Sequence, residues 1–172
     1  MAESRKFIYY SLGLYAIYSA ILYILGFFSI GLLGDDYLNI YDALNSTFYQ
    51  KLTGQLPFTN TFHIRPVYYL SLEKSVTISH LLGLANDNFI WFRIQNLILL
   101  LFIAFVSGLT VYYLTKRSSV SLAASIAILL FPNNINNICW MAARVDLICC
   151  FFYVTTILLF LLYSDTKKKL FF

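Results

Sequence analysis

Two adjacent carboxylates, Asp35 and Asp36, follow a long uncharged run in the segment GDDYLNIYDAL. One interpretation is structural: Gly34 ends the first helix, and an aspartate caps the next helix and interacts favourably with its dipole. The other interpretation is chemical, because a carboxylate held beside a cavity can act as a catalytic base or as a ligand of a divalent cation. The doublet by itself leaves both interpretations open.

A second candidate site lies in the segment FHIRPVYYL, residues 62–70. Arg65 precedes a proline, which favours an extended conformation at that position, and His63 lies two residues before it. The planar guanidinium group of an arginine can bind two phosphate oxygens at once. An arginine that reaches from an apolar surface towards lipid headgroups has the same sequence pattern. A phosphate site and an interface anchor are therefore both compatible with this segment.

A third candidate site lies in the segment CWMAARVDL, residues 139–147. On a continuous helix, Trp140 and Arg144 are i, i+4 neighbours and Asp146 projects from another face. Such residues at the start of a span mark either the membrane interface, where tryptophan is enriched, or a polar cavity inside the bundle. The pattern is compatible with both.

The composition identifies the environment in which these residues must be positioned. Of the 172 residues, 60% are hydrophobic and 12% are charged, whereas soluble domains average about 45–50% apolar and about 25% charged residues. The mean hydropathy is +0.73. We therefore predict an all-α integral membrane protein, a single transmembrane domain over residues 1–172. Nucleic-acid binding has no support from any motif, and the net charge of +4 is better explained by the orientation of the spans.

Four apolar segments are candidates for spans, since a spanning helix needs about 20 residues. They cover residues 7–33, 94–115, 119–132 and 139–163. The third is short: a helix over residues 120–131 reaches roughly 18 Å, against a hydrocarbon core of about 30 Å. The PNNINN segment that follows is then predicted to place irregular polar backbone partly at membrane depth, where it must be buried in protein or line a watery cavity.

The basic residues orient these spans, because short cytoplasmic loops are rich in lysine and arginine. With four spans, seven of the twelve basic residues lie on the side of the two termini. If residues 67–84 also crossed the membrane, the basic residues at positions 116–117 and 167–169 would lie on the external side, against this rule. We therefore predict cytoplasmic termini, in an inner membrane or its equivalent, and an external loop over residues 34–93. Two interface helices are expected in this loop, over residues 35–52 and 67–84.

The order of these features is more specific than any one of them. Along the chain the motifs are GDDYLN after the first span, RPVYYLSL in the external loop, FRIQN at the second span, LFPNNINN after the third and WMAARVDL at the fourth. In this order the sequence resembles the N-terminal half of polytopic glycosyltransferases of the GT-C superfamily. It is most similar to the protein O-mannosyltransferase-like and bacterial lipid-linked sugar transferases.

The resemblance implies transfer of a hexose or pentose from a polyprenyl-phosphate carrier to an acceptor hydroxyl on the extracytoplasmic side. Membrane lipid and the carrier would then be the partners. By this resemblance Asp35 or Asp36 deprotonates the acceptor, with a divalent cation beside the pair in some members. The same similarity implies that Arg65, with His63 nearby, faces the carrier phosphate. The family's W-x-x-x-R-x-D turn, assigned to the substrate and lipid phosphate, is matched by Trp140, Arg144 and Asp146.

Two departures from the family pattern fall at positions that the resemblance assigns to contacts with the sugar donor. Pro132 is followed by asparagines where many relatives carry histidine or glutamate, and Arg93 and Gln95 lie near Asn96 where relatives often carry a histidine. Because the resemblance extends over only the first half of such enzymes, a fragment, a truncated product or one subunit of a split transferase is expected. The alternative functions are a non-catalytic four-span protein that binds polyprenyl lipid or a partner subunit, and a small transporter. An apolar mid-membrane region argues against the transporter.

Overall fold

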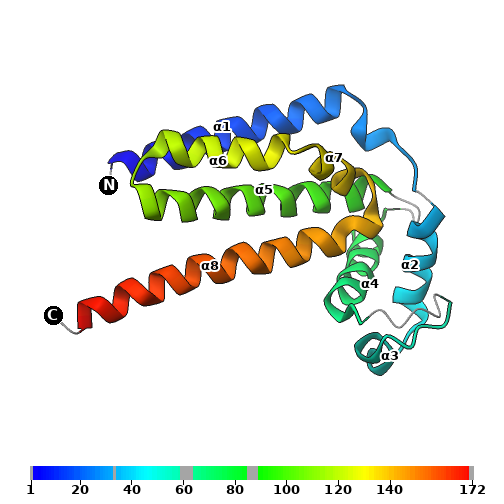
Figure 1. Ribbon diagram of the computed structural model, residues 1–172. Coiled ribbons are helices and arrows are strands. Elements are labelled where there is room, and N and C mark those ends of the chain that lie inside the picture. Colours follow the sequence, from blue (N-terminus) through cyan, green and yellow to red (C-terminus); the bar gives the residue numbers. More distant parts are fainter. Residues whose placement is uncertain (1, 33, 59–63, 85–88, 171–172) are drawn as a thin grey trace.

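The protein is an all-α helical bundle with a layer of shorter helices at one end. The computed structural model describes residues 2–32, 34–58, 64–84 and 89–170. The bundle consists of α1 (Ala2–Ile24), α5 (Phe89–Thr115), α6 (Ser118–Leu130) and α8 (Arg144–Leu170), which run alongside one another (Figure 1). The end layer consists of α2 (Gly34–Asn45), α3 (Phe48–Thr53) and α4 (Pro66–Leu81). The start of α1 and the end of α8 lie at the opposite end of the bundle (Figure 1).

The described part of the structure has three or four candidate spans, against the four predicted. Three segments of the described chain are long and apolar enough to cross a membrane: Glu3–Ile24, Ile90–Thr115 and Met141–Asp165. Helix α6 and the short α7 (Pro132–Cys139) meet the same criterion together, but they are bent by 57° at the break between them. The chain is therefore a polytopic membrane protein with three spans, or four if the bent pair crosses as one.

Several predicted span boundaries are wrong. Helix α1 ends at Ile24, because Gly26 adopts a φ of 75° in the left-handed region that glycine enters at little cost, and a 3-10 turn at Phe27–Ser29 follows. The PNNINN segment is helical rather than irregular, since Pro132 lies in the first turn of α7, where a missing N–H is tolerated. Helix α5 begins at Phe89, before the expected start, and α8 begins only at Arg144.

The first of the two predicted interface helices is also interrupted. The structure ends α2 at Asn45, and Thr47 starts α3 with a capping box, in which the Thr47 hydroxyl accepts from the Gln50 amide at 3.3 Å and the Gln50 side chain accepts from the Thr47 amide at 2.8 Å. Several apolar residues spaced for one face of a helix over residues 35–52 are exposed, namely Leu38, Tyr41, Leu44, Phe48 and Leu52. These helices thus present apolar side chains outwards, as expected at a membrane interface.

The end layer has its own small core and ion pair. Tyr68, Leu72 and Val76 of α4 pack with Ala43 of α2 in one buried cluster. The buried ammonium group of Lys51 donates a hydrogen bond to Glu73, and this bond lowers the pKa of the Glu73 carboxyl below its ordinary value. The second helix predicted in the loop is present as α4, with Thr77 and His80 on its exposed side.

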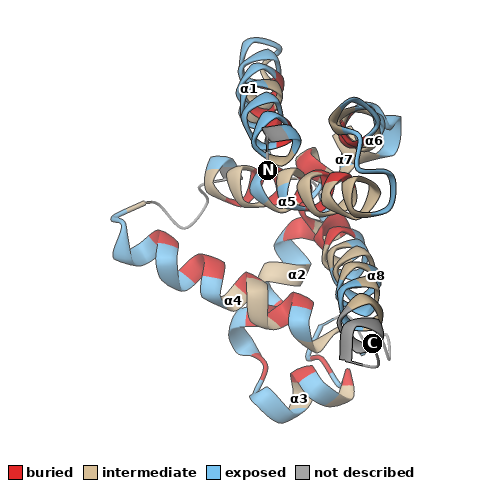
Figure 2. Ribbon diagram, turned by 90° about the vertical axis from the view of Figure 1, so that its left-hand side faces the viewer, coloured by how far each residue is buried: buried red, intermediate tan, exposed pale blue. Residues whose placement is uncertain are grey.

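Helix α5 lies at the centre of the bundle and contributes four of the ten buried residues of the main core cluster. Leu97, Leu100 and Ile103 of α5 pack with residues of α1, α6 and α8 in one cluster. By contrast, within the described side chains of α8 none beyond Leu147 is buried (Figure 2). An exposed apolar surface of this length is suited to contact with hydrocarbon in a membrane.

Side chains of α1 and α6 both lie close to the backbone of α5 at Gly108. The hydroxyl of Ser125 on α6 donates to the Ala104 carbonyl of α5 at 2.9 Å. A Cβ atom at Gly108 would lie 2.4 Å from the Ser125 Oγ and 2.7 Å from the Phe7 Cζ. Small residues at such contacts let membrane helices pack closely.

Replacing Gly108 with alanine is therefore expected to force α1 and α6 away from α5. The free energy of unfolding in detergent should fall by about 1–3 kcal/mol, the usual effect of overpacking. The matched control is Gly13→Ala on α1, where an added Cβ meets nothing within 4 Å. That variant should be neutral or more stable by up to about 1 kcal/mol, because alanine is the better helix former. Equal stability of the two variants would contradict the close packing at Gly108.

Candidate functional site

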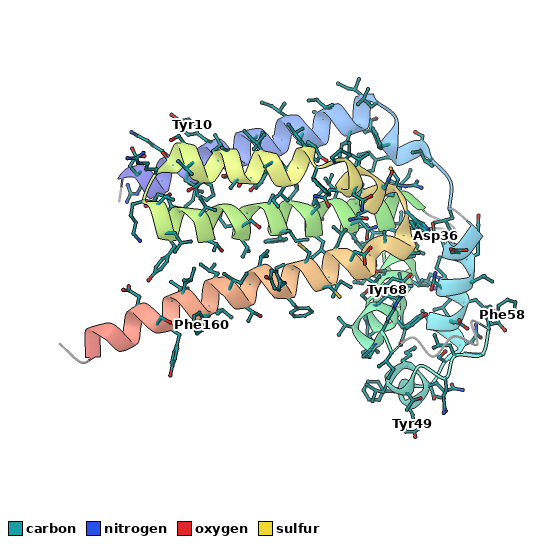
Figure 3. All side chains as sticks on the ribbon, viewed as in Figure 1. Tyr10, Asp36, Tyr49, Phe58, Tyr68 and Phe160 are labelled. Atoms are coloured by element: carbon teal, nitrogen blue, oxygen red, sulfur yellow. The ribbon has the colours of Figure 1, made fainter. Side chains whose placement is uncertain are left out.

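A group of buried polar residues lies where the end layer meets the bundle. Figure 3 shows Asp36 of α2 and Tyr68 of α4 at this junction, next to the first turns of α8. The side chains buried here include Ser75, Arg93, Asn96 and Arg144, from three different helices. Burial of this many polar groups is costly unless each finds a partner. Their hydrogen bonds therefore determine how the junction is built.

The two adjacent aspartates have different environments. Asp36 is fully buried, and its Oδ1 accepts a hydrogen bond of 3.0 Å from the backbone N–H of Ala142, in the 3-10 turn Met141–Ala143 that precedes α8. The side chain of Asp35 is exposed. Both lie in the first turn of α2, where the helix dipole favours a negative charge. The predicted end of the first helix at Gly34 is wrong, because α1 ends at Ile24 and Gly34 begins α2. Asp36 has a structural role, since it joins α2 to the turn before α8, while Asp35 is exposed.

Arg144 is the hub of the buried hydrogen bonds, with a side chain only 4% exposed. Its Nε donates to the Asn96 Oδ1 at 2.7 Å and its Nη1 to the Ser75 Oγ at 2.8 Å. Its Nη2 donates to the Gln95 Oε1 at 3.0 Å and to the Phe92 carbonyl at 3.1 Å. These bonds join α8 to α4 and α5. Arg144 is therefore held inside the protein and is not an anchor to lipid headgroups.

Arg93 is a second buried arginine, and its sequence position marked it only as a departure from the family pattern. Its Nη2 donates to the Gly31 carbonyl at 2.8 Å, its Nη1 donates to the Ile30 carbonyl, and its Nε donates to the Cys139 carbonyl at 3.3 Å. It thereby fastens the segment between α1 and α2 to the end of α7. The only signal in the sequence was a positive charge at the start of a long apolar span, which is costly unless it is paired.

The negative charge of Asp36 offsets part of the positive charge at the junction. The Asp36 carboxylate interacts electrostatically with the guanidinium groups of both Arg93 and Arg144. Without it, two positive charges would be buried with neutral hydrogen-bond partners, which is strongly unfavourable in a low-dielectric interior. Asn96 adds a further link, since its Nδ2 donates to the Asn137 carbonyl of α7 at 3.1 Å. Helices α2, α5, α7 and α8 are thus joined by one polar network.

The buried hydroxyl group of Tyr68 lies near this network without a hydrogen bond to it in the described part of the chain. Burial raises the pKa of its phenol, with smaller contributions in the same direction from Tyr69 and Asp36. The Tyr68 hydroxyl has no hydrogen-bond partner within the described part of the chain. A buried polar atom left in this state costs about 1–3 kcal/mol, so water or a ligand oxygen is expected beside it.

The phosphate-binding candidates of the external loop are only partly described. Arg65 immediately precedes α4, is half-buried, and lies close enough to Tyr68 to act on the pKa of its phenol. It therefore belongs to the junction. His63 lies outside the described residues.

The residues of the WMAARVDL segment are divided between two cavities. Trp140 has an extended backbone (φ −99°, ψ 114°) between α7 and the 3-10 turn, so the predicted i, i+4 pairing with Arg144 on a continuous helix is wrong. Arg144 lines a cavity of about 320 Å³ with Lys74, Ser75 and Gln95. Trp140 and Asp146 line a separate cavity of about 240 Å³ together with asparagines of α7.

The aspartates that the structure describes do not by themselves form a binding site for a divalent cation. Among the residues that the structure describes, no three or more His, Cys, Asp and Glu side chains are grouped so that they could hold a metal ion. Calcium and magnesium prefer six or more oxygen ligands, whereas Asp36 is engaged with a backbone amide. We therefore assign no chemical step to a cation.

The comparisons with known proteins do not identify a family. No protein-family model, no curated protein and no solved structure matches this chain. Evidence on function therefore comes from the junction and from the order of the motifs along the sequence.

Proposed function

We propose that the junction between the end layer and the bundle is the reaction site of a GT-C-type membrane glycosyltransferase. The reaction transfers a hexose or pentose from a polyprenyl-phosphate carrier to an acceptor hydroxyl on the extracytoplasmic side. The observation that carries the proposal is convergence: Asp36 of the acidic pair contacts Ala142 in the WMAARVDL segment, 106 residues further along the chain. Arg65 and Arg144 lie at the same junction, at the opposite end from the start of α1 (Figure 1).

The exposed Asp35 is the catalytic base in this proposal. It takes the proton of the acceptor hydroxyl, whose oxygen then bonds to the anomeric carbon of the sugar. The bond between that carbon and the carrier phosphate breaks, and the phosphate leaves with the electron pair. Asp36 is a positioning residue, because its buried carboxylate already accepts a hydrogen bond from the Ala142 amide.

The cavity of about 320 Å³ between α4, α5 and α8 suits the carrier phosphate. Lys74 at its rim is exposed, and Arg144 forms part of its wall. Cationic side chains stabilise the negative charge that develops on the leaving phosphate. Leu99 and Ile148 line the same cavity and provide an apolar surface for the start of a polyprenyl chain.

The test is a transfer assay on membrane vesicles that contain the protein, supplied with polyprenyl phosphates that carry hexoses or pentoses. We expect Asp35→Asn to lower the rate about 10²–10⁴-fold, the usual contribution of a general base. The matched control is Glu3→Gln, which removes an exposed carboxylate at the other end of the bundle and should leave the rate unchanged. A rate unaltered by Asp35→Asn would overturn the role of Asp35. Donor binding without any transfer would favour a non-catalytic lipid-binding protein.

A further inference from the structure

The cavity between α7 and α8 has a wall of amide side chains. Asn133, Asn136 and Asn137 line it from α7, followed by Trp140, and Asp146 contributes from the first turn of α8. Positions i, i+3 and i+4 of a helix share one face, so the three asparagines project towards the cavity together. Among the described residues that line this cavity there is no lysine and no arginine.

Part of this wall is already hydrogen-bonded within the protein, and part is available to a ligand. The Asn137 side chain donates to Asn134 at 3.4 Å, and the Asn134 side chain donates to the Ile128 carbonyl at 2.6 Å. These bonds hold α7 in place against α6. Within the described part of the chain, the side chains of Asn133, Asn136 and Asp146 make no hydrogen bond.

The chemistry of this lining suits a neutral ligand that carries hydroxyl groups. Each asparagine side chain offers both a donor and an acceptor, as a hydroxyl group requires, and a carboxylate accepts from further hydroxyls. The flat face of an indole packs against the C–H groups of a sugar ring and keeps a polar edge in water. An anion would find no cationic partner among the described lining residues and would be repelled by Asp146.

The volume of the cavity restricts the size of the ligand. It measures about 240 Å³, below the approximately 300–1,000 Å³ of pockets that hold drug-sized molecules. A single sugar ring is therefore a suitable occupant. The neighbouring cavity with Lys74 and Arg144 differs in charge, and Arg144 and Asp146, two residues apart, project from opposite sides of the start of α8.

We propose that the α7–α8 cavity binds one neutral sugar ring, through the side chains of Asn133, Asn136 and Asp146 with Trp140 against the ring face. The α7–α8 cavity is then a second sugar position of the proposed transferase, distinct from the cationic cavity on the other side of α8, and this reading of it rests on the proposed function. Sugar binding itself does not depend on transfer and can be measured without it.

The experiment uses tryptophan fluorescence of the full chain in detergent. The chain contains two tryptophans, so Trp91→Phe makes Trp140 the single reporter. Titration with methyl hexopyranosides and methyl pentopyranosides should give a saturable change with at least one of them, and inorganic phosphate should not displace it. Adding Asn133→Leu and Asn136→Leu should raise the Kd at least tenfold. The matched control is Asn45→Leu, an exposed asparagine of α2, which should leave the Kd unchanged.

Saturation-transfer NMR with the unsubstituted chain gives the same measurement if Trp91→Phe does not fold. Absence of saturable binding of every glycoside by both methods would overturn the inference, as would equal affinity in the double asparagine variant. Displacement of the sugar by inorganic phosphate would overturn the assignment of a neutral ligand. Sugar binding by a chain that shows no transfer would support this inference while the proposed function fails. Transfer that continues without sugar binding at Trp140 would support the proposed function and overturn this inference.

Discussion

Replacing Arg144 with leucine is expected to destabilise the protein strongly. The buried guanidinium donates to Asn96, Ser75, Gln95 and the Phe92 carbonyl. Leucine supplies none of these donors, so several buried acceptors lose their partner while the Asp36 charge loses part of its compensation. The free energy of unfolding should fall by about 3–5 kcal/mol, the range found when one member of a buried charge network is removed.

Denaturant unfolding in mild detergent measures this effect. Arg144→Lys should be intermediate, because an ammonium group keeps the charge but lacks the planar fork that reaches several acceptors. The matched control is Arg5→Leu, an exposed arginine of α1, which should change stability by no more than about 0.5 kcal/mol. If Arg144→Leu were as stable as Arg5→Leu, the polar network would not be what holds α8 to α4 and α5.

Asp36→Ala is expected to separate the start of α2 from the turn before α8. The substitution removes the acceptor of the Ala142 amide and the negative charge that faces Arg93 and Arg144. A loss of about 3–5 kcal/mol is expected, since two buried positive charges are left without compensation. Asp36→Asn should cost less, because its side-chain oxygen can still accept from the amide.

The adjacent aspartate provides the control for Asp36. Asp35→Asn alters an exposed side chain in the same turn of α2 and should leave stability within about 0.5 kcal/mol of the original. Amide hydrogen exchange at Ala142 gives an independent measurement, and it should accelerate in Asp36→Ala and not in Asp35→Asn. If both variants were equally stable, or if exchange at Ala142 were unaffected by Asp36→Ala, the proposed division between a positioning and a catalytic aspartate would be wrong.

The membrane class, the approximate positions of the spans and the helix over residues 66–81 could all be predicted from the sequence. Each depends on a local property: an apolar run long enough to cross hydrocarbon must be helical, because its backbone groups can be satisfied only within the segment. Local properties did not predict the end of α1 at Ile24 or the helical form of the PNNINN segment. The first depends on the conformation of Gly26, and the second on packing, since asparagine alone disfavours helix.

The sequence singled out residues of the candidate site but did not predict how they are arranged in space. The rarity of charge in an apolar chain is enough to single out Asp35, Asp36 and Arg144, and the same reasoning applies to Arg93. Only the tertiary structure decided that Asp36 is buried and Asp35 exposed, that Asp36 lies beside both arginines, and that Arg144 and Asp146 line different cavities. The physical reason is that the spans are apolar on all sides, so their sequences do not specify which face of each helix turns inwards.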